Sequence, residues 1–184
     1  MNNNIIRSAT FITALGVVIM LAGYTRSPAA AAFHEARVTE VNDGDTVTLT
    51  MNSKKYRTRL IGIDAPEMRQ RPWGRRVKDH LVEIMDRSGW IVSVETDIVP
   101  RDKYDRLLVY LWTRDHVFIN EQLVLDGYAV LFTIPPNSKY GERLGSAEDT
   151  AKRDKKGIWG LNGLKEKPAE YRKKHPRKTH RYDW

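Results

Sequence analysis

The stretch Tyr56-Arg57-Thr58-Arg59-Leu60-Ile61-Gly62-Ile63-Asp64-Ala65-Pro66-Glu67 decides how this chain of 184 residues folds. Its first eight residues are mostly aromatic, β-branched or aliphatic, which predicts a β-strand over residues 56–63. Asp64-Ala65-Pro66-Glu67 ends this strand, since proline cannot continue a ladder of backbone hydrogen bonds. The sequence therefore predicts a strand that is followed directly by acidic residues.

Four further strands are predicted on either side of this stretch. They cover residues 36–41, 46–51, 90–98 and 107–112. Residues 46–51 alternate apolar and threonine side chains, a pattern typical of a strand with one buried face. Residues 107–112 are apolar on both faces, which favours a central strand.

Three helices complete the predicted elements. They cover residues 75–87, 118–126 and 140–156. The first carries its apolar residues on one side, as a helix that packs on a core does. Five short strands with a helix inserted after the third indicate the oligonucleotide-binding (OB) architecture. We therefore predict an α+β fold, mainly β, with a five-stranded OB-type barrel and about three helices.

Charge is distributed unevenly along the chain. The net charge is +8, yet residues 33–160 hold 21 Lys and Arg against 20 Asp and Glu. Residues 161–184 hold eight basic residues against three acidic ones, and we expect them to form a flexible basic tail. An anion site in residues 33–160 must therefore come from particular arginines. The chain has no cysteine, which excludes a disulfide scaffold, a thiolate zinc site and a thiol nucleophile.

Residues 1–32 have the pattern of an export signal. Arg7 gives a positive start, residues 8–25 carry no charge, and residues 27–32 supply small side chains for cleavage. An uncleaved membrane anchor is the alternative, although the apolar run is slightly shorter than the roughly 20 residues that span a bilayer. We expect an exported protein, periplasmic or secreted, that contacts a membrane only if this segment is uncleaved.

Three carboxylates stand where predicted strands begin or end. Asp45 precedes the strand 46–51, while Asp64 and Glu67 follow the strand 56–63. Ends of neighbouring antiparallel strands meet at one edge of a sheet, so Asp45 and Asp64 could share a hard cation with backbone carbonyls and water. Taken singly, Asp43 and Asp45 are better explained as turn residues, and Asp64 as the end of a strand before Pro66.

Arginines in the neighbouring strands favour an anion site over this simpler explanation. Arg59 lies within the strand 56–63, and Arg106 precedes the strand 107–112. A guanidinium in a small barrel needs an anionic partner, because its burial alone is costly. Two arginines beside a cation could hold the oxygens of a phosphodiester, while Glu67 orients or deprotonates a water. A structural salt bridge is the alternative, and we expect one for Arg57.

Three segments resemble the signature segments of the thermonuclease (staphylococcal-nuclease-like) family. They are Asn42-Asp43-Gly44-Asp45-Thr46-Val47, Arg59-Leu60-Ile61-Gly62-Ile63-Asp64-Ala65-Pro66-Glu67 and Asp102-Lys103-Tyr104-Asp105-Arg106, in the family's order and spacing. The similarity extends over roughly residues 36–160. It implies an OB-fold nuclease domain over residues 33–160 that hydrolyses phosphodiester bonds of DNA and RNA with low sequence specificity.

The resemblance implies a metal site and a residue that acts on water. Asp45 and Asp64 would bind Ca²⁺, with the backbone carbonyl of Ala65 as a further ligand. Glu67 would position or activate the attacking water. Two carboxylates with a carbonyl and water form a loose oxygen site, which suits Ca²⁺ better than an ion that demands rigid octahedral geometry.

The resemblance also implies which residues hold the substrate. Arg59 and Arg106 would bind the phosphate and stabilise the transition state. Lys103 and Tyr104 would contact the neighbouring nucleotide. DNA and RNA are the expected partners, no obligate protein partner is implied, and we expect a monomer.

The chain departs from the family pattern at three places. Ala65 stands where the best-studied member has a threonine, and Asp105 stands where it has a turn glycine. Residues 129–136 lack the two tyrosines that flank the nucleotide in that member. Phe132 could stack on a base instead, but we expect it to pack in the core.

The basic tail leaves alternatives open. Arg172-Lys173-Lys174 and Arg177-Lys178, interleaved with aromatic residues, could grip a nucleic-acid backbone or could simply aid solubility. His175 and His180 could bind a metal, but a solvated tail explains them better.

The sequence is compatible with three functions. They are an exported nuclease, a non-catalytic nucleic-acid-binding OB module and an envelope-anchored adaptor. The presence of every implied acidic and arginine position argues against the second.

Overall fold

The computed structural model describes residues 33–176, which form seven strands, four α-helices and one short 3-10 helix. The strands are β1 His34–Val41, β2 Thr46–Met51, β3 Lys54–Leu60, β4 Gly62–Asp64, β5 Ile91–Glu95, β6 Leu107–Thr113 and β7 Val130–Phe132. The helices are α1 Trp73–Arg87, α2 Ile119–Leu125, α3 Gly141–Arg153, η1 Gly157–Trp159 and α4 Pro168–Lys174. Within residues 33–176, no helix is long and apolar enough to cross a membrane. The predicted export signal, residues 1–32, lies outside the described residues.

Five strands close into a barrel in the order β1-β2-β3-β6-β5, which confirms the predicted architecture. Neighbouring strands pair antiparallel, except that β3 runs parallel to β6. The β2–β3 ladder sets Thr46 opposite Arg59, so the start of β2 lies beside the end of β3. The barrel thus brings the turn that carries Asp45 next to the strand that carries Arg59.

The predicted third strand is in fact two strands. β3 ends at Leu60, and Gly62 adopts φ +80°, a left-handed conformation that glycine tolerates best. The chain turns there, and β4 pairs antiparallel with β7 in a separate two-stranded sheet. A side chain at position 62 would also overlap Leu144 of α3. Asp64 therefore stands on the small sheet rather than on the barrel.

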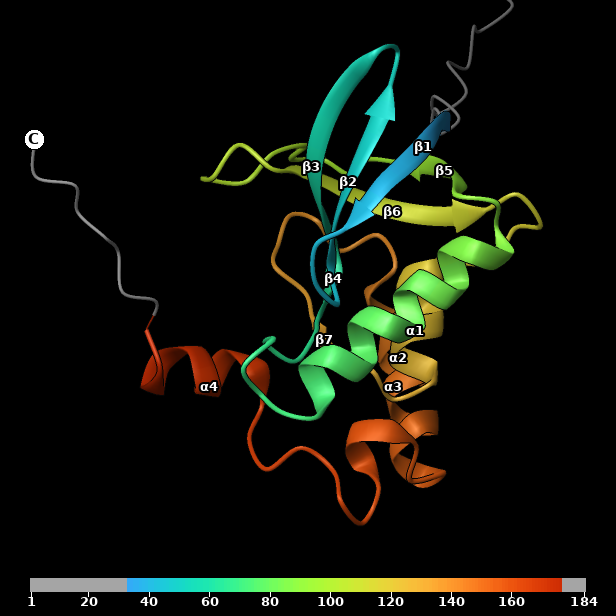
Figure 1. The fold of residues 1–184 in the computed structure, drawn as a ribbon. Helices are drawn as coiled ribbons and strands as arrows, with labels where there is room; N and C mark the ends of the chain where they lie inside the picture. Colours follow the sequence, from blue (N-terminus) through green and yellow to red (C-terminus); the bar gives the residue numbers. More distant parts are fainter. Residues whose placement is uncertain (1–32, 177–184) are drawn as a thin grey trace, which may run out of the picture. The chain divides into compact units, whose positions relative to one another are not determined.

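Helices α1, α2 and α3 gather at one end of the barrel (Figure 1). The apolar stripe of α1, which includes Val77, Leu81 and Met85, is fully buried in the main core. Asn120 of α2 is buried too, and its amide donates to the carbonyl of Ile61 and accepts from the amide of Leu111. This side chain links α2 to the irregular stretch between β3 and β4 and to β6.

The described part of the predicted tail carries a helix. After η1 the chain runs back toward the loop before α1 and forms α4. The indole nitrogen of Trp73 donates to the carbonyl of Asn162, and the amide of Gln70 donates to the carbonyl of Glu166. These bonds link residues 161–176 to the loop before α1 and to its first residue. Helix α4 was not predicted, while the flexibility expected of residues 161–184 stays a prediction.

Candidate active site

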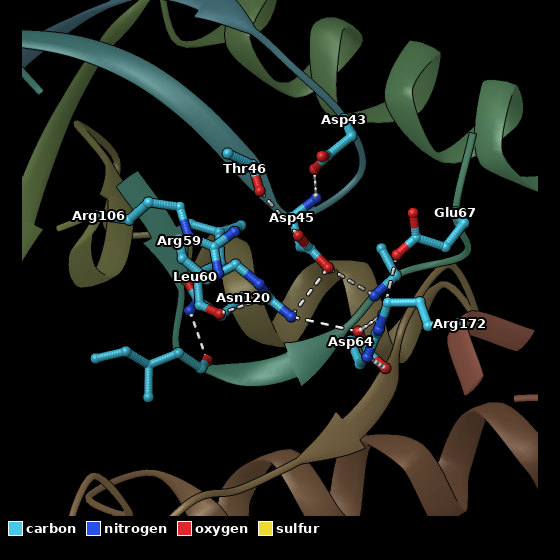
Figure 2. Close-up of polar contacts among 12 residues, drawn as sticks. Asp43, Asp45, Thr46, Arg59, Leu60, Asp64, Glu67, Arg106, Asn120 and Arg172 are labelled. Atoms are coloured by element: carbon cyan, nitrogen blue, oxygen red, sulfur yellow. Dashed lines mark hydrogen bonds and ion pairs between the residues drawn. The ribbon is translucent and has the colours of Figure 1, made fainter. Parts of the chain in front are cut away.

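The Arg59 guanidinium bridges the carboxylates of Asp45 and Asp64. Its Nη2 lies 3.1 Å from Asp45 Oδ2 and 3.3 Å from Asp64 Oδ1 (Figure 2). Its Nη1 donates to the carbonyl of Leu60 at 2.6 Å. Because one nitrogen contacts both acids, their oxygens face each other across a single cationic atom. The predicted proximity of the two carboxylates is thus present, although Asp64 reaches it from the small sheet.

Backbone bonds fix Asp45 in this position. The amide of Leu60 donates to the Asp45 carbonyl, and the amide of Ala65 donates to Asp45 Oδ2, both at 2.9 Å. Gly44 precedes it, and a Cβ there would overlap Val77 of α1 and Ala65. Glycine is needed at position 44 because α1 approaches the turn this closely. The turn, the small sheet and the first helix therefore position the acid together.

Burial sets the electrostatics of the acids. The side chain of Asp64 is 1% exposed, and burial raises its pKa, against the lowering effect of Arg172 and Arg59. Burial also raises the pKa of Asp43, and the neighbouring Asp45 charge adds to that rise. Acids gathered this closely and desolvated need a compensating cation.

Glu67 faces the same cluster from the loop after β4. Its side chain is 19% exposed, and Oε1 accepts from Arg172 Nη1 at 3.1 Å. Its backbone amide donates to the side chain of Gln70, which holds the turn of the loop. Glu67 is thus beside Asp64 and within reach of a group bound there, as a residue that orients water must be.

Arg106 lies in the same cleft but pairs elsewhere. Its guanidinium contacts Asp102 Oδ2 at 2.7 Å and lies over the ring of Tyr104. Burial alone would raise the pKa of Asp102, but the hydrogen bonds from Arg106 and from the amide of Tyr104 lower it. The Tyr104 ring is 69% exposed and lines the cleft, with Lys103 beside it. Asp102 thus holds Nε and Nη2 of Arg106.

A cleft of about 1060 Å³ leads across these groups. Eight basic side chains line it: Lys54, Lys55, Arg57, Arg59, Arg69, Arg101, Arg106 and Arg172. Phe132 also lines it and is 38% exposed, which contradicts the expectation that this ring packs in the core. A basic, aromatic-edged cleft with acids at one end matches an anionic polymer.

The side chains of the site supply only part of the oxygen ligands that a hard cation needs. In residues 33–176, no group of three His, Cys, Asp or Glu is placed to hold a metal. Asp45 and Asp64 could supply two carboxylate oxygens, so backbone carbonyls such as that of Ala65, together with water, would complete the shell. Oxygen-only, incomplete protein coordination is compatible with Ca²⁺.

Arg172 is the site residue that the sequence did not predict. It forms two hydrogen bonds to Asp64 and one to Glu67, although it follows these residues in the sequence by 108 and 105 positions. The basic run 172–174 was visible, but a run of charges in a polar segment does not indicate which of its members is paired. Arg57, expected in a salt bridge, instead lines the cleft as an exposed side chain.

The chain is similar to proteins of known class. The family model described as "Staphylococcal nuclease homologue" matches residues 57–160. A thermonuclease of Staphylococcus hyicus is 34% identical over 128 residues, covering 67% of this chain and 74% of the relative. The chain belongs to the staphylococcal nuclease family. As a member it is a hydrolase of the nuclease class.

Two further relatives show how far the likeness extends. A thermonuclease of Staphylococcus intermedius is 30% identical over 166 residues, covering 84% of this chain and 97% of the relative. "Endonuclease YhcR" of Bacillus subtilis is 32% identical over 161 residues, covering 79% of this chain but 13% of that protein. The staphylococcal nuclease fold thus occurs in relatives of very different length.

Proposed function

We propose that this nuclease hydrolyses phosphodiester bonds of DNA and RNA with low sequence specificity and depends on Ca²⁺. The single observation that carries the proposal is the Arg59 guanidinium held between Asp45 and Asp64. A cation that already bridges two acids at the end of a basic cleft is placed to hold a phosphate that enters beside a metal. Family membership supports the same reaction.

Each side chain has a distinct role in this proposal. Asp45 and Asp64 hold the metal. When the metal is bound, its positive charge stabilises the negative charge on the phosphate oxygens. Glu67 accepts a proton from, or orients, the attacking water. Arg59 donates to a phosphate oxygen in a fixed fork, and Arg106 adds a second donor after leaving Asp102. The water-derived hydroxyl and the phosphorus form the new bond while the bridging P–O bond breaks.

The exposed ring of Tyr104 would stack on a base of the neighbouring nucleotide, and Lys103 would contact its phosphate. The ring is 69% exposed at the cleft, and every base offers a face for stacking. Stacking of this kind does not distinguish base sequence. It would favour single-stranded or locally opened substrates.

We propose further that the protein is exported, on the sequence of residues 1–32. The N-terminal residue of the mature protein, determined after expression in a bacterium, tests this. A start near Phe33 supports cleavage, and a retained residue 1 in a membrane fraction supports the anchor.

Digestion of denatured DNA tests the activity. The full chain should degrade it in Ca²⁺, lose activity in excess EDTA and regain it when Ca²⁺ is restored. Glu67→Gln should lower kcat by roughly 100-fold or more, the usual scale for a lost acid–base group. The matched control Glu142→Gln changes an exposed glutamate of α3 and should match wild type. Wild-type protein that binds DNA but never cleaves it would favour the non-catalytic binding module.

A further inference from the structure

The C-terminal helix α4 places a cation directly on the proposed metal ligand. Arg172 Nη1 and Nη2 lie 2.9 Å from Oδ1 and Oδ2 of Asp64, so the fork engages both carboxylate oxygens. The same Nη1 lies 3.1 Å from Glu67 Oε1. In the view of Figure 2 the guanidiniums of Arg59 and Arg172 approach Asp64 from opposite sides. One side chain thus occupies the proposed metal ligand and the proposed base together.

Contacts around α4 hold this arginine at the site. Arg69 Nη2 donates to the carbonyl of His175 at 3.0 Å, and Lys174 pairs with Glu166 at 2.8 Å. The rings of Tyr171 and His175 stack, with centroids 4.1 Å apart, and both line the cleft. The bond from Arg69 thus fastens the end of α4 to the active-site loop, while the other two contacts hold the helix segment together. The helix presents Arg172 inward rather than leaving it to move freely in solvent.

The contact is nonetheless one that can open. The Arg172 side chain is 39% exposed, and α4 buries only Pro168. Apart from the bonds of Arg172 to Asp64 and Glu67, α4 is held to the rest of the protein by the exposed bond from Arg69 to the His175 carbonyl, which water can replace at little cost. A short helix with this little buried apolar surface belongs to the low-stability part of a protein.

Arg172 and a metal ion exclude each other at Asp64. Arginine stays protonated at every relevant pH, so the contact cannot be relieved by loss of a proton. Arg172 holds both Asp64 oxygens, whereas Arg59 contacts Oδ1. A divalent cation on Oδ2 would therefore repel Arg172 at contact distance while the Arg59 contact to Oδ1 stays in place. The same guanidinium of Arg172 also contacts Oε1 of Glu67, the proposed base. A metal ion that binds Asp64 would therefore compete with Arg172 for this carboxylate.

We propose that Arg172 is an internal substitute for the metal, and that α4 is an autoinhibitory element which the metal displaces. The inference rests on the proposed function, because it assigns Asp64 to the metal. In the absence of the ion, Arg172 compensates the buried acid and blocks the base. Binding of the ion releases Arg172 and opens the cleft beside Tyr171 and His175 to the substrate.

Calcium titration of the full chain without nucleic acid tests the competition. Arg172→Ala should bind Ca²⁺ at least fivefold more tightly than wild type in calorimetry. Lys173→Ala, the matched control, removes the same charge from an exposed neighbour on α4 and should stay within twofold of wild type. Arg172→Gln, which keeps a hydrogen-bonding side chain without the charge, should behave like the alanine variant and serves if that variant folds poorly.

Hydrogen exchange of α4 gives a second readout that does not depend on activity. Ca²⁺ should speed exchange over residues 168–175 at least fivefold in wild type and leave the already fast exchange of Arg172→Ala unchanged. Equal Ca²⁺ affinities and unchanged exchange would overturn the inference while leaving Ca²⁺-dependent hydrolysis intact. Absence of Ca²⁺ binding in all variants would overturn the metal assignment and the inference with it.

Discussion

Arg59 determines whether the acids of the site can coexist. It is 14% exposed, and it compensates Asp45 and the almost fully buried Asp64 at once. Removing such a cation leaves like charges facing each other in a poorly solvated place, which costs several kcal/mol in comparable buried pairs. The same residue is the proposed phosphate donor. The Arg59 guanidinium therefore contributes to both stability and activity. A substitution that tests its role in activity must leave the folded state stable.

Asn120 stabilises the backbone from which the site is built. It is 0% exposed, and its side chain serves the carbonyls of Ile61 and Val109 and the amide of Leu111. Asn120→Ala leaves these buried groups without that partner, and we expect a loss of about 3 kcal/mol or more in unfolding free energy. Urea denaturation measures it. Asn162→Ala, at an exposed position, should change stability by less than about 0.5 kcal/mol; a similar small change for Asn120→Ala would contradict this role.

At the scale of elements, periodicity predicted the barrel well. The alternation over residues 46–51 gave β2 with its bounds, and the apolar stripe of residues 75–87 gave α1 to within two residues. The break at Gly62 was not predicted, because residues 56–63 are continuously strand-forming and only the sheet pairing shows where the chain turns. Helix α4 was missed because it is fastened by polar bonds to a distant loop, and local composition carries no trace of such bonds.

The packing of α1 against α2 should depend on pH through Asp126, the residue that ends α2. Burial alone would raise the pKa of Asp126, but hydrogen bonds from His80 of α1 and from Gln122 outweigh it and lower the pKa below the ordinary 3.8. A lowered pKa stabilises the folded state above that value, and the gain is lost as pH falls through the lower folded pKa.

Thermal melts of Asp126→Asn test this contribution. The variant should be less stable than wild type at pH 6 to 7, and the difference should shrink as the pH falls below about 3.8. Asp149→Asn, at an exposed position of α3, is the control and should follow wild type throughout. A difference in melting temperature that stays constant across this pH range would show that the contribution of Asp126 to stability does not depend on its charge.

For the whole molecule, the expected binding of nucleic acid depends more on where the charged side chains lie than on the net charge. Residues 33–160 are nearly neutral, yet the cleft gathers eight basic side chains beside the acidic cluster. The overall basicity is therefore a poor guide to the binding surface, and composition does not show that Lys54 and Lys55, at the start of β3, line the same cleft as Arg101. That grouping follows from the strand pairing of the barrel.

The cleft should make nucleic-acid binding depend on salt. We expect the affinity for single-stranded DNA to fall linearly with salt on a logarithmic plot, with a slope of about −0.7 for each phosphate neutralised. Changing Lys54 and Lys55 together to Gln should make the slope shallower by roughly 0.7 to 1.4 units. Changing Lys165 and Lys167, which are exposed and do not line the cleft, should leave the slope unaltered. Equal slopes for both pairs would place the polymer elsewhere.

The role of the planar Arg59 guanidinium is tested by comparing Arg59→Lys with Arg37→Lys. Arg37 is exposed on β1 and serves as the control. Lysine retains the positive charge between Asp45 and Asp64, so the fold should survive, but it cannot offer a planar pair of donors. The measurement is kcat/KM on denatured DNA in Ca²⁺, with circular dichroism to confirm folding. We expect Arg59→Lys to fall by about 100-fold or more, the scale of a lost transition-state donor, and Arg37→Lys to match wild type. Equal kcat/KM for Arg59→Lys and wild type would contradict the assignment of this cluster as the hydrolytic site.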